Sequence, residues 1–295
     1  MIDNYINNYQ KINLTLPSWS IKSYGGSSFA CNNNLLVSTR NSQNKSRISL
    51  YRLEKNSDNS LFYTTPLRSS LLDNHKDYYR NSLGQSYPFF VKINSINILF
   101  FTDWYYDQSQ QRILNRLIIG NFNEQFYLER IHIFKTGLLS KSGAIRAYVI
   151  EDNLIIFLPI FQNFEHNFPD YVIHKFKFKL DQNETFESLI KKFSSIKGTP
   201  LITGFSKTTC FNIVQYLNKK TDSYDVIFSG RNNNQKYNIY LGNINKNFNF
   251  VSNIRKLDFD QSLSYPSLYF DGNDLFLISS LGRYGDQGLI ISIIK

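Results

Sequence analysis

Cysteine is scarce in this sequence of 295 residues, and the scarcity excludes two classes of protein. Cys31 and Cys210 are the only cysteines, too few and too far apart for a disulfide framework or a zinc site. We therefore expect two free, buried thiols in a reducing compartment. The histidines lack the spacing of metal ligands; they stand at positions 75, 132, 166 and 174. The sequence also lacks a Gly-rich phosphate-binding loop, so it predicts neither a bound metal nor a cofactor.

Long hydrophobic runs are also missing. The longest apolar run covers residues 154–161, short of the about 20 residues that cross a bilayer. The first 20 residues contain no apolar segment of the kind found in signal peptides. We expect a protein without a membrane span, located in the cytoplasm.

Acidic residues are outnumbered by basic ones. The chain has 33 Lys and Arg against 23 Asp and Glu, a net charge of +10. This excess favours anionic partners. The basic residues are spread along the chain without a block of five or six, so we do not expect a nucleic acid partner.

Hydrophobic and aromatic residues, in contrast, are plentiful. They make up 42% and 16% of the chain, enough for a sizeable buried core. Tyr and Phe are typical of half-buried strands, and the abundant Ser and Asn are typical of turns. The composition therefore favours an all-β fold.

Two stretches of the chain repeat each other. Residues 38–50 align without a gap on residues 229–241, with six of 13 positions identical. A second, shorter repeat is the tripeptide Ser-Tyr-Pro, which occurs at 86–88 and again at 264–266. Polar tips recur about every 60 residues, and units of about 40–60 residues are typical of propeller blades. We predict a single five-bladed β-propeller over residues 20–295, preceded by an N-terminal extension at 1–19.

Local patterns predict individual elements. Apolar residues at 186, 189, 190 and 193 have helical spacing, and they predict a short helix between Asn183 and Gly198. Clean alternation from 171 to 180 predicts a strand. Prolines follow Tyr87 and Tyr265, and a following proline favours extended backbone at both tyrosines.

The order of the motifs carries a family resemblance. They lie at residues 38–48, 84–88, 102–104, 228–231, 264–268 and 281–289. In this order they resemble the five-bladed propeller superfamily of arabinanases, levansucrases and invertases, over roughly residues 20–295. They are more closely similar to glycoside-hydrolase-like proteins of surface-polysaccharide gene sets. Those proteins share the string Ser-x-Arg-(Asp/Asn)-x-x-Asn-x-Ser-x-Ile in blade one and Tyr-Gly-x-x-Gly in blade five.

The sequence departs from that superfamily at its acids. Members that cleave glycosides carry carboxylates in blades one, two and three, and hydrolysis needs a carboxylate pair. The corresponding segments here, 25–29, 86–88 and 142–146, contain no Asp or Glu. The resemblance therefore supplies no catalytic acid. Asp77 and Asp103 are the acids that the pattern places near the propeller axis, and they are the catalytic candidates.

Arginines and aromatic residues are the candidates for ligand binding. Propeller ligands sit at the mouth of the central channel. The arginines at matched blade positions are Arg40, Arg146, Arg231 and Arg283. Each could bind phosphate or carboxylate, or could instead join neighbouring blades. The aromatic candidates are Tyr87, Trp104, Tyr265 and Tyr284, which could contact a sugar or simply pack between blades.

These observations lead to two hypotheses of function. In the first, the chain is a carbohydrate-processing propeller that acts on an anionic sugar or nucleotide-sugar in surface-glycan biosynthesis. Its chemistry would then be glycosidase-like or glycosyltransferase-like. In the second, it is a non-catalytic glycan-binding or scaffolding propeller that has lost the hydrolase carboxylates.

Overall fold

The structure is a computed structural model, and it describes most of the chain. The described residues are 9–30, 33–57, 62–72, 75, 82–109, 111–135, 137–161, 171–195, 197–201, 203–218, 222–232, 236–251, 253–259, 262–270, 275–282 and 285–294. Nearly all regular structure in these ranges is β-strand, accompanied by one α-helix, so the all-β prediction is confirmed.

The first sheet has eight strands, in the order β2-β3-β4-β6-β7-β8-β9, with β5 paired to β4. Its strands are β2 (Lys22–Phe29), β3 (Asn34–Arg40), β4 (Ser46–Lys55), β5 (Phe62–Arg68), β6 (Gly84–Ile93), β7 (Ile96–Asp107), β8 (Arg112–Phe122) and β9 (Leu128–Ile133). Pairing is antiparallel within β2–β5 and within β6–β9. One parallel bridge, between Ser46 and Gly84, joins the two runs.

The second sheet repeats this plan, in the order β10-β11-β12-β14-β15-β16-β17, with β13 paired to β12. Its strands are β10 (Arg146–Ile150), β11 (Asn153–Phe161), β12 (Tyr171–Lys179), β13 (Thr199–Leu201), β14 (Lys207–Asn218), β15 (Ser223–Arg231), β16 (Asn238–Asn245) and β17 (Arg255–Lys256). A parallel bridge between Tyr171 and Lys207 joins its two antiparallel runs. The strand predicted at 171–180 is confirmed as β12.

The third sheet has four strands, in the order β1-β20-β19-β18. They are β1 (Tyr9–Lys11), β18 (Leu263–Phe270), β19 (Leu275–Leu281) and β20 (Leu289–Ile294). Here β1, from the part of the sequence assigned to an N-terminal extension, pairs antiparallel with β20, with Tyr9 opposite Ser292.

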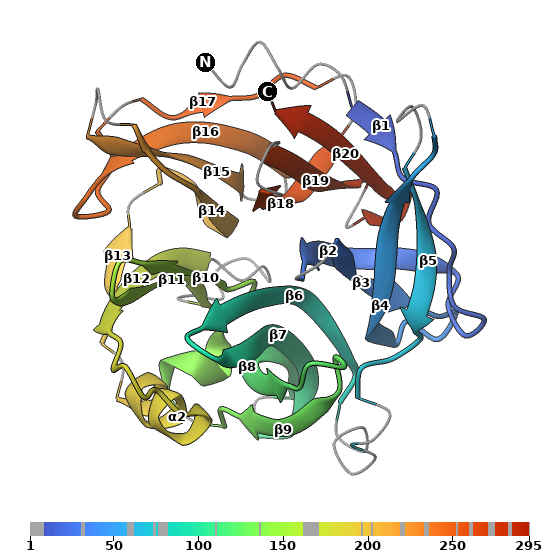
Figure 1. Ribbon diagram of the computed structural model, residues 1–295, viewed down its shortest axis with the longest axis horizontal. Helices are drawn as coiled ribbons and strands as arrows, with labels where there is room; N and C mark the ends of the chain where they lie inside the picture. Colours follow the sequence, from blue (N-terminus) through green and yellow to red (C-terminus); the bar gives the residue numbers. More distant parts are fainter. Residues whose placement is uncertain are drawn as a thin grey trace.

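The sheets surround a common centre, and the first strand of each antiparallel run lies innermost (Figure 1). These inner strands are β2, β6, β10, β14 and β18. They contact one another in a ring, each touching the next and β18 touching β2. The described ends of the chain meet in one sheet, where β1 lies beside β20 (Figure 1).

The helix α2 (Phe186–Ser194) lies at the periphery, where the sequence predicted it (Figure 1). Thr185 begins it with a capping box shared with Ser188, which satisfies two backbone N–H groups. Its apolar face buries Phe186, Leu189 and Phe193 in the largest core cluster. The described part of the chain contains no helix long and apolar enough to cross a membrane.

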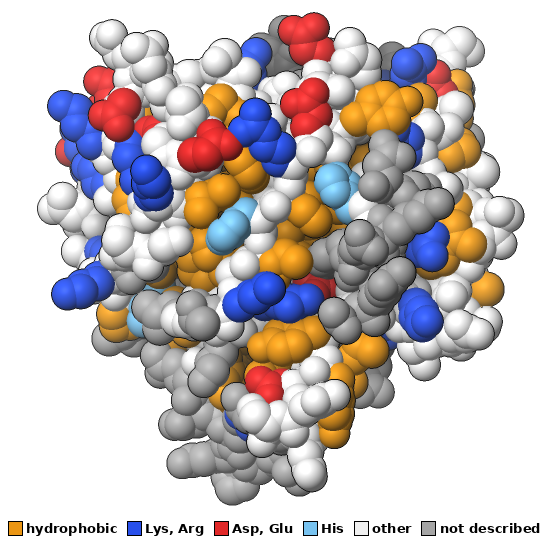
Figure 2. Space-filling model, turned by 90° about the horizontal axis from the view of Figure 1, so that it is seen from below, with side chains coloured by type: hydrophobic (Ala, Val, Ile, Leu, Met, Phe, Trp, Pro, Cys, Tyr) orange, Lys and Arg blue, Asp and Glu red, His pale blue; other side chains and the backbone are white. Residues whose placement is uncertain are grey.

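The repeated string forms equivalent hairpins. Its first copy covers the end of β3 and the start of β4, and its second covers the end of β15 and the start of β16. The serines that open the two copies, Ser38 and Ser229, are fully buried. On the face in Figure 2, Lys and Arg are dispersed among acidic, apolar and neutral side chains rather than gathered in one patch.

Candidate functional site

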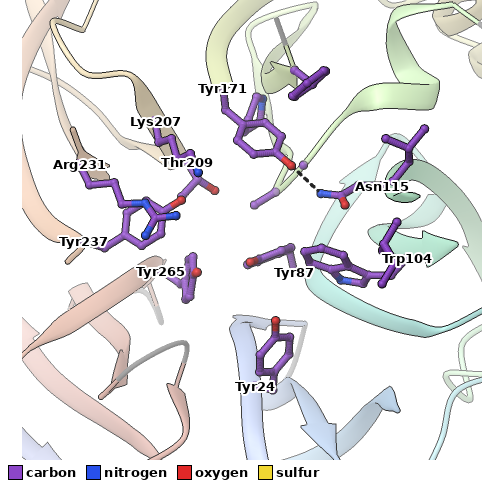
Figure 3. A pocket seen from close by; sticks show the side chains of 16 residues that line it. Tyr24, Tyr87, Trp104, Asn115, Tyr171, Lys207, Thr209, Arg231, Tyr237 and Tyr265 are labelled. Atoms are coloured by element: carbon purple, nitrogen blue, oxygen red, sulfur yellow. Dashed lines mark hydrogen bonds between the residues drawn. The ribbon is translucent and has the colours of Figure 1, made fainter. Parts of the chain in front are cut away.

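A pocket of about 320 Å³ opens where the inner strands begin. It is lined by Tyr24, Tyr87, Trp104, Ile113, Leu114, Asn115, Gly143, Ala144, Pro159, Phe161, Tyr171, Lys207, Thr209, Arg231, Tyr237 and Tyr265 (Figure 3). Strands β2, β6, β14 and β18 each contribute at least one of these residues, and the segment before β10 contributes two. The pocket therefore lies at the amino-terminal ends of the inner strands.

Irregular backbone aims two tyrosines toward the pocket. Tyr87 and Tyr265 both have φ of 54°, so the extended backbone expected from the following prolines is wrong. The pairing of β6 with β7 shifts register between Ser86 and Phe89, and β18 shifts against β19 in the same place within its own Ser-Tyr-Pro segment. At such a bulge the extra residue leaves the ladder, so a proline without an N–H is accommodated beside it. Left-handed backbone at non-glycine residues clusters at functional sites.

The two tyrosine rings meet at the centre of the molecule. Their centroids are 5.1 Å apart and their planes make an angle of 63°, an edge-to-face contact. Together with Ala144 and Cys210 they form a buried group, which we call the axial cluster. Trp104 and Tyr237 pack against it.

Two glycines of β2 let this cluster pack closely. Gly25 and Gly26 have φ of 68° and 84°. A Cβ on Gly25 would lie 2.8 Å from the Cβ of Ser86, and one on Gly26 would lie 3.3 Å from the Cβ of Tyr265. Side chains here would therefore push β2 away from β6 and β18.

Burial raises the pKa of three tyrosines of the pocket. It raises the pKa of Tyr87 and of Tyr265 well above 10, and their mutual proximity is a smaller influence. The pKa of Tyr171 is raised for the same reason. Its hydroxyl accepts a hydrogen bond from Asn115 Nδ2 at 3.0 Å (Figure 3). At neutral pH these phenols are therefore uncharged hydrogen-bonding groups.

Two cationic side chains line the pocket, and among its described lining residues there is no Asp or Glu. Lys207 is 2% exposed, and it is paired in register with Arg231 on the adjacent strand. The Arg231 guanidinium lies 4.4 Å from the centre of the Tyr237 ring. The described lining is thus aromatic and positively charged, which suits an anionic ligand.

Four of the predicted ligand-binding residues meet in this pocket: Tyr87, Trp104, Arg231 and Tyr265. Trp104 Nε1 donates to Ser86 Oγ at 2.7 Å, which orients the indole beside Tyr87 (Figure 3). Arg283, Tyr284 and Asp77 lie outside the described residues.

The other two predicted arginines lie behind the lining. Arg40 stacks on the ring of Tyr24, with its guanidinium carbon 3.2 Å from the ring centre. Arg146 is fully buried at the start of β10. Both contact residues next to or within the lining rather than forming it.

Asp103 is also fully buried and does not line the pocket. Arg116 donates from Nε at 2.8 Å and forms an ion pair from Nη2 at 2.8 Å, both to Oδ2 of Asp103. Ser82 Oγ donates to Oδ1. A catalytic role for Asp103 stays a prediction, and these contacts already occupy both of its oxygens.

The sequence did not single out several lining residues, among them Tyr24, Asn115, Tyr171, Lys207 and Tyr237. One signal was present for Tyr24. Ser23-Tyr24-Gly25 begins like the two Ser-Tyr-Pro segments, and it too contains left-handed backbone, at Gly25 rather than at the tyrosine. Lys207 and Tyr171 had no local signal, because only the parallel bridge between β12 and β14 brings them together. Among the residues described, no group of His, Cys, Asp or Glu could hold a metal ion.

Comparison with known proteins reveals likeness in fold alone. No protein-family model matches the sequence, and no curated protein is similar to it. A Bombyx mori GH32 β-fructofuranosidase superposes with a TM-score of 0.59 at 9% identity, covering 98% of this chain, which spans 62% of the enzyme's length. An α-L-arabinofuranosidase from Lactobacillus brevis gives 0.57 at 7% identity, covering 99% of this chain and 94% of the other. A Leishmania mexicana mannose phosphorylase in complex with a phosphate ion gives 0.55 at 14% identity, covering 97% and 88%. The chain therefore shares the β-propeller fold of these solved structures.

Proposed function

We propose that the pocket binds an anionic carbohydrate, in the service of surface-glycan biosynthesis. The carrying observation is its lining. Lys207 and Arg231 stand beside a wall of tyrosines, and no described lining residue is acidic. Arginine and lysine recognise phosphate or carboxylate, and the uncharged phenols supply hydrogen bonds to sugar hydroxyls.

The size of the pocket favours a single sugar unit. A cavity of about 320 Å³ lies at the lower end of the range of about 300–1,000 Å³ for ligand pockets. It can enclose one monosaccharide with its anionic group. In a nucleotide-sugar, the nucleoside would lie outside, over the rim near Ile113, which is 55% exposed.

The arrangement of strands supports five blades. The antiparallel runs β2–β5, β6–β9, β10–β13 and β14–β17 each have four strands, and β18–β20 reach four by adding β1. Ring contact among the five inner strands is what such a closed propeller requires.

The described lining favours binding over hydrolysis. Two-carboxylate glycoside hydrolysis needs a pair of acids flanking the bond. Asp103 is the catalytic candidate that the structure describes, and both of its oxygens accept hydrogen bonds from Ser82 or Arg116. We therefore favour the glycan-binding hypothesis over the processing enzyme, while both share the anionic sugar as ligand.

Matched ligand pairs test the proposal. Thermal shift and calorimetric titration would compare glucose with glucose 1-phosphate, mannose with mannose 1-phosphate, galactose with galacturonate, and UDP-glucose alone. We expect at least one anionic member to stabilise the protein by about 2.7 kcal/mol at 100 times its Kd, with no effect from its neutral partner. Failure of every anionic compound would refute the proposal.

Variants locate the binding to the pocket. Arg231→Gln and Lys207→Met each remove one of the two cations of the pocket, and each should lower the affinity for the anionic ligand by tenfold or more. Lys177→Met removes an exposed charge of β12 and should leave binding unchanged. Equal affinity in all three variants would place the anion elsewhere. Turnover of the bound sugar, with water or with phosphate as acceptor, would instead support the processing enzyme.

A further inference from the structure

Arg146 is a buried cation, and its hydrogen-bond partners among the described residues are uncharged. Its side chain is 0% exposed. Nε donates to Asn212 Oδ1 at 3.1 Å, and Nη1 donates to its neighbour's carbonyl, Ile145 O, at 2.8 Å. Nη2 donates to Pro266 O at 3.2 Å. The guanidinium also lies 4.9 Å from the centre of the Phe89 ring.

The charge is uncompensated within the described part of the chain. None of the ion pairs there involves Arg146, although a guanidinium stays protonated in proteins. Burying a charge without a counter-charge is costly, and carbonyl dipoles with one aromatic ring offset that cost only in part. An anion nearby would lower the free energy of this arrangement.

The contacts of Arg146 place its charge directly behind the pocket. Ile145 follows Ala144 in the chain, and Pro266 follows Tyr265; both Ala144 and Tyr265 line the pocket. The charge also acts on the axial cluster. Burial raises the pKa of the Cys210 thiol, and the Arg146 charge opposes that rise.

We propose that Arg146 is a buried specificity determinant, which makes the pocket select anionic over neutral sugars without touching the ligand. The inference rests on the function proposed above and names how the site discriminates. Because Ala144, Ile145 and Tyr265 are at most 1% exposed, the field of Arg146 is screened less on its way to the pocket than it would be in water. For separations of about 10 Å and a dielectric constant of about 20, one such charge changes the affinity for an anion on the order of tenfold.

Three variants separate charge from structure. Arg146→Gln removes the charge, and Arg146→Lys keeps it while losing the planar fork. Asn212→Ala is the structural control, because it removes one partner of Arg146 and three further hydrogen bonds donated by its own amide, without changing any charge.

The measurement is titration of glucose 1-phosphate and mannose 1-phosphate at pH 5.0 and pH 7.5. A phosphate monoester gains its second charge near pH 6. The described lining contains no His, Asp or Glu, and the pKa values of Tyr148 and Cys210, beside Arg146, are raised, so these groups stay uncharged in that range. If the field of Arg146 acts on the ligand, the sugar phosphates bind more tightly at pH 7.5 than at pH 5.0, and this gain in affinity is smaller in Arg146→Gln.

The expected result is a roughly tenfold loss of affinity at pH 7.5 in Arg146→Gln, a smaller pH gain than in the wild type, and near-normal selectivity in Arg146→Lys and Asn212→Ala. Equal loss at both pH values, or the same loss in Asn212→Ala, would overturn the inference and leave anionic sugar binding intact. If Arg146→Gln does not fold, Arg146→Lys decides: retained pH gain supports the charge, and its loss refutes it. Absence of wild-type binding to any anionic sugar would overturn the proposed function and this inference together.

Discussion

Removal of the Asp103 carboxylate should destabilise the fold rather than impair ligand binding selectively. Asp103 is fully buried, and the side chain of its partner Arg116 is 11% exposed. Two contacts of 2.8 Å from Arg116 converge on Oδ2, and Ser82 donates to Oδ1. Asp103→Asn keeps the shape of the side chain but removes its negative charge. The new amide N–H groups would face Arg116 or Ser82, which are themselves donors.

Breaking a buried pair by removing one partner costs about 3–5 kcal/mol. Because Arg116 retains some exposure, its uncompensated charge is partly hydrated, and we expect the lower end, about 3 kcal/mol. For a chain of this size that loss lowers Tm by roughly 5 °C. The β7–β8 hairpin contains both partners and should loosen first, since Asp103 and Arg116 lie opposite each other in its register.

Urea unfolding of Asp103→Asn, Arg116→Met and the double variant measures the coupling directly. Asp258→Asn is the control, because its side chain is 94% exposed and its contact with Lys256 is 3.8 Å long. The reasoning is wrong if Asp103→Asn changes the free energy of unfolding by less than about 0.5 kcal/mol. A stable variant that loses turnover would instead establish Asp103 as a catalytic residue.

Two further changes test other parts of the structure. Burial alone would raise the pKa of Glu184, but hydrogen bonds from Lys192, Ser188 and a backbone N–H bring this pKa below 4.5. The ionised Glu184 side chain therefore stabilises the fold above pH 4.5, and this contribution is lost as the pH falls through the lowered pKa. Glu184→Gln should flatten the acid limb of the stability–pH curve, and an unchanged curve would contradict this assignment. Gly84→Ala should lower the free energy of unfolding in urea by about 1–3 kcal/mol, because its Cβ would lie 2.9 Å from the backbone nitrogen of Ser46. A variant as stable as the wild type would show that the bridge between β4 and β6 can shift freely.

Periodicity in the sequence was sufficient to predict individual elements and the β-propeller fold. The helical spacing from 186 to 193 gave α2, and alternation from 171 gave β12, because each pattern matches the geometry of its own element. The repeated string predicted equivalent hairpins, since similar sequence units in a repeat protein adopt the same local structure and pack in the same way.

The site was only partly accessible from the sequence. The Ser-Tyr-Pro repeat identified Tyr87 and Tyr265, but not the left-handed backbone that aims them inward, since a bulge depends on the partner strand. Asp103 was a catalytic candidate because the motif pattern placed it near the propeller axis. Its pairing with Arg116 depends on the register of β7 against β8, which composition does not specify.

The pairing of β1 with β20 also has a consequence for the order of folding. The sheet of β18–β20 gains its fourth strand from the opposite end of the described chain, with Tyr9 opposite Ser292. Contacts so distant in sequence form late, because the entropy of closing the loop must be overcome first. Until they form, β20 presents an unpaired edge that can join another chain. The sheet of β18–β20 is therefore vulnerable to edge-to-edge association until β1 pairs with β20.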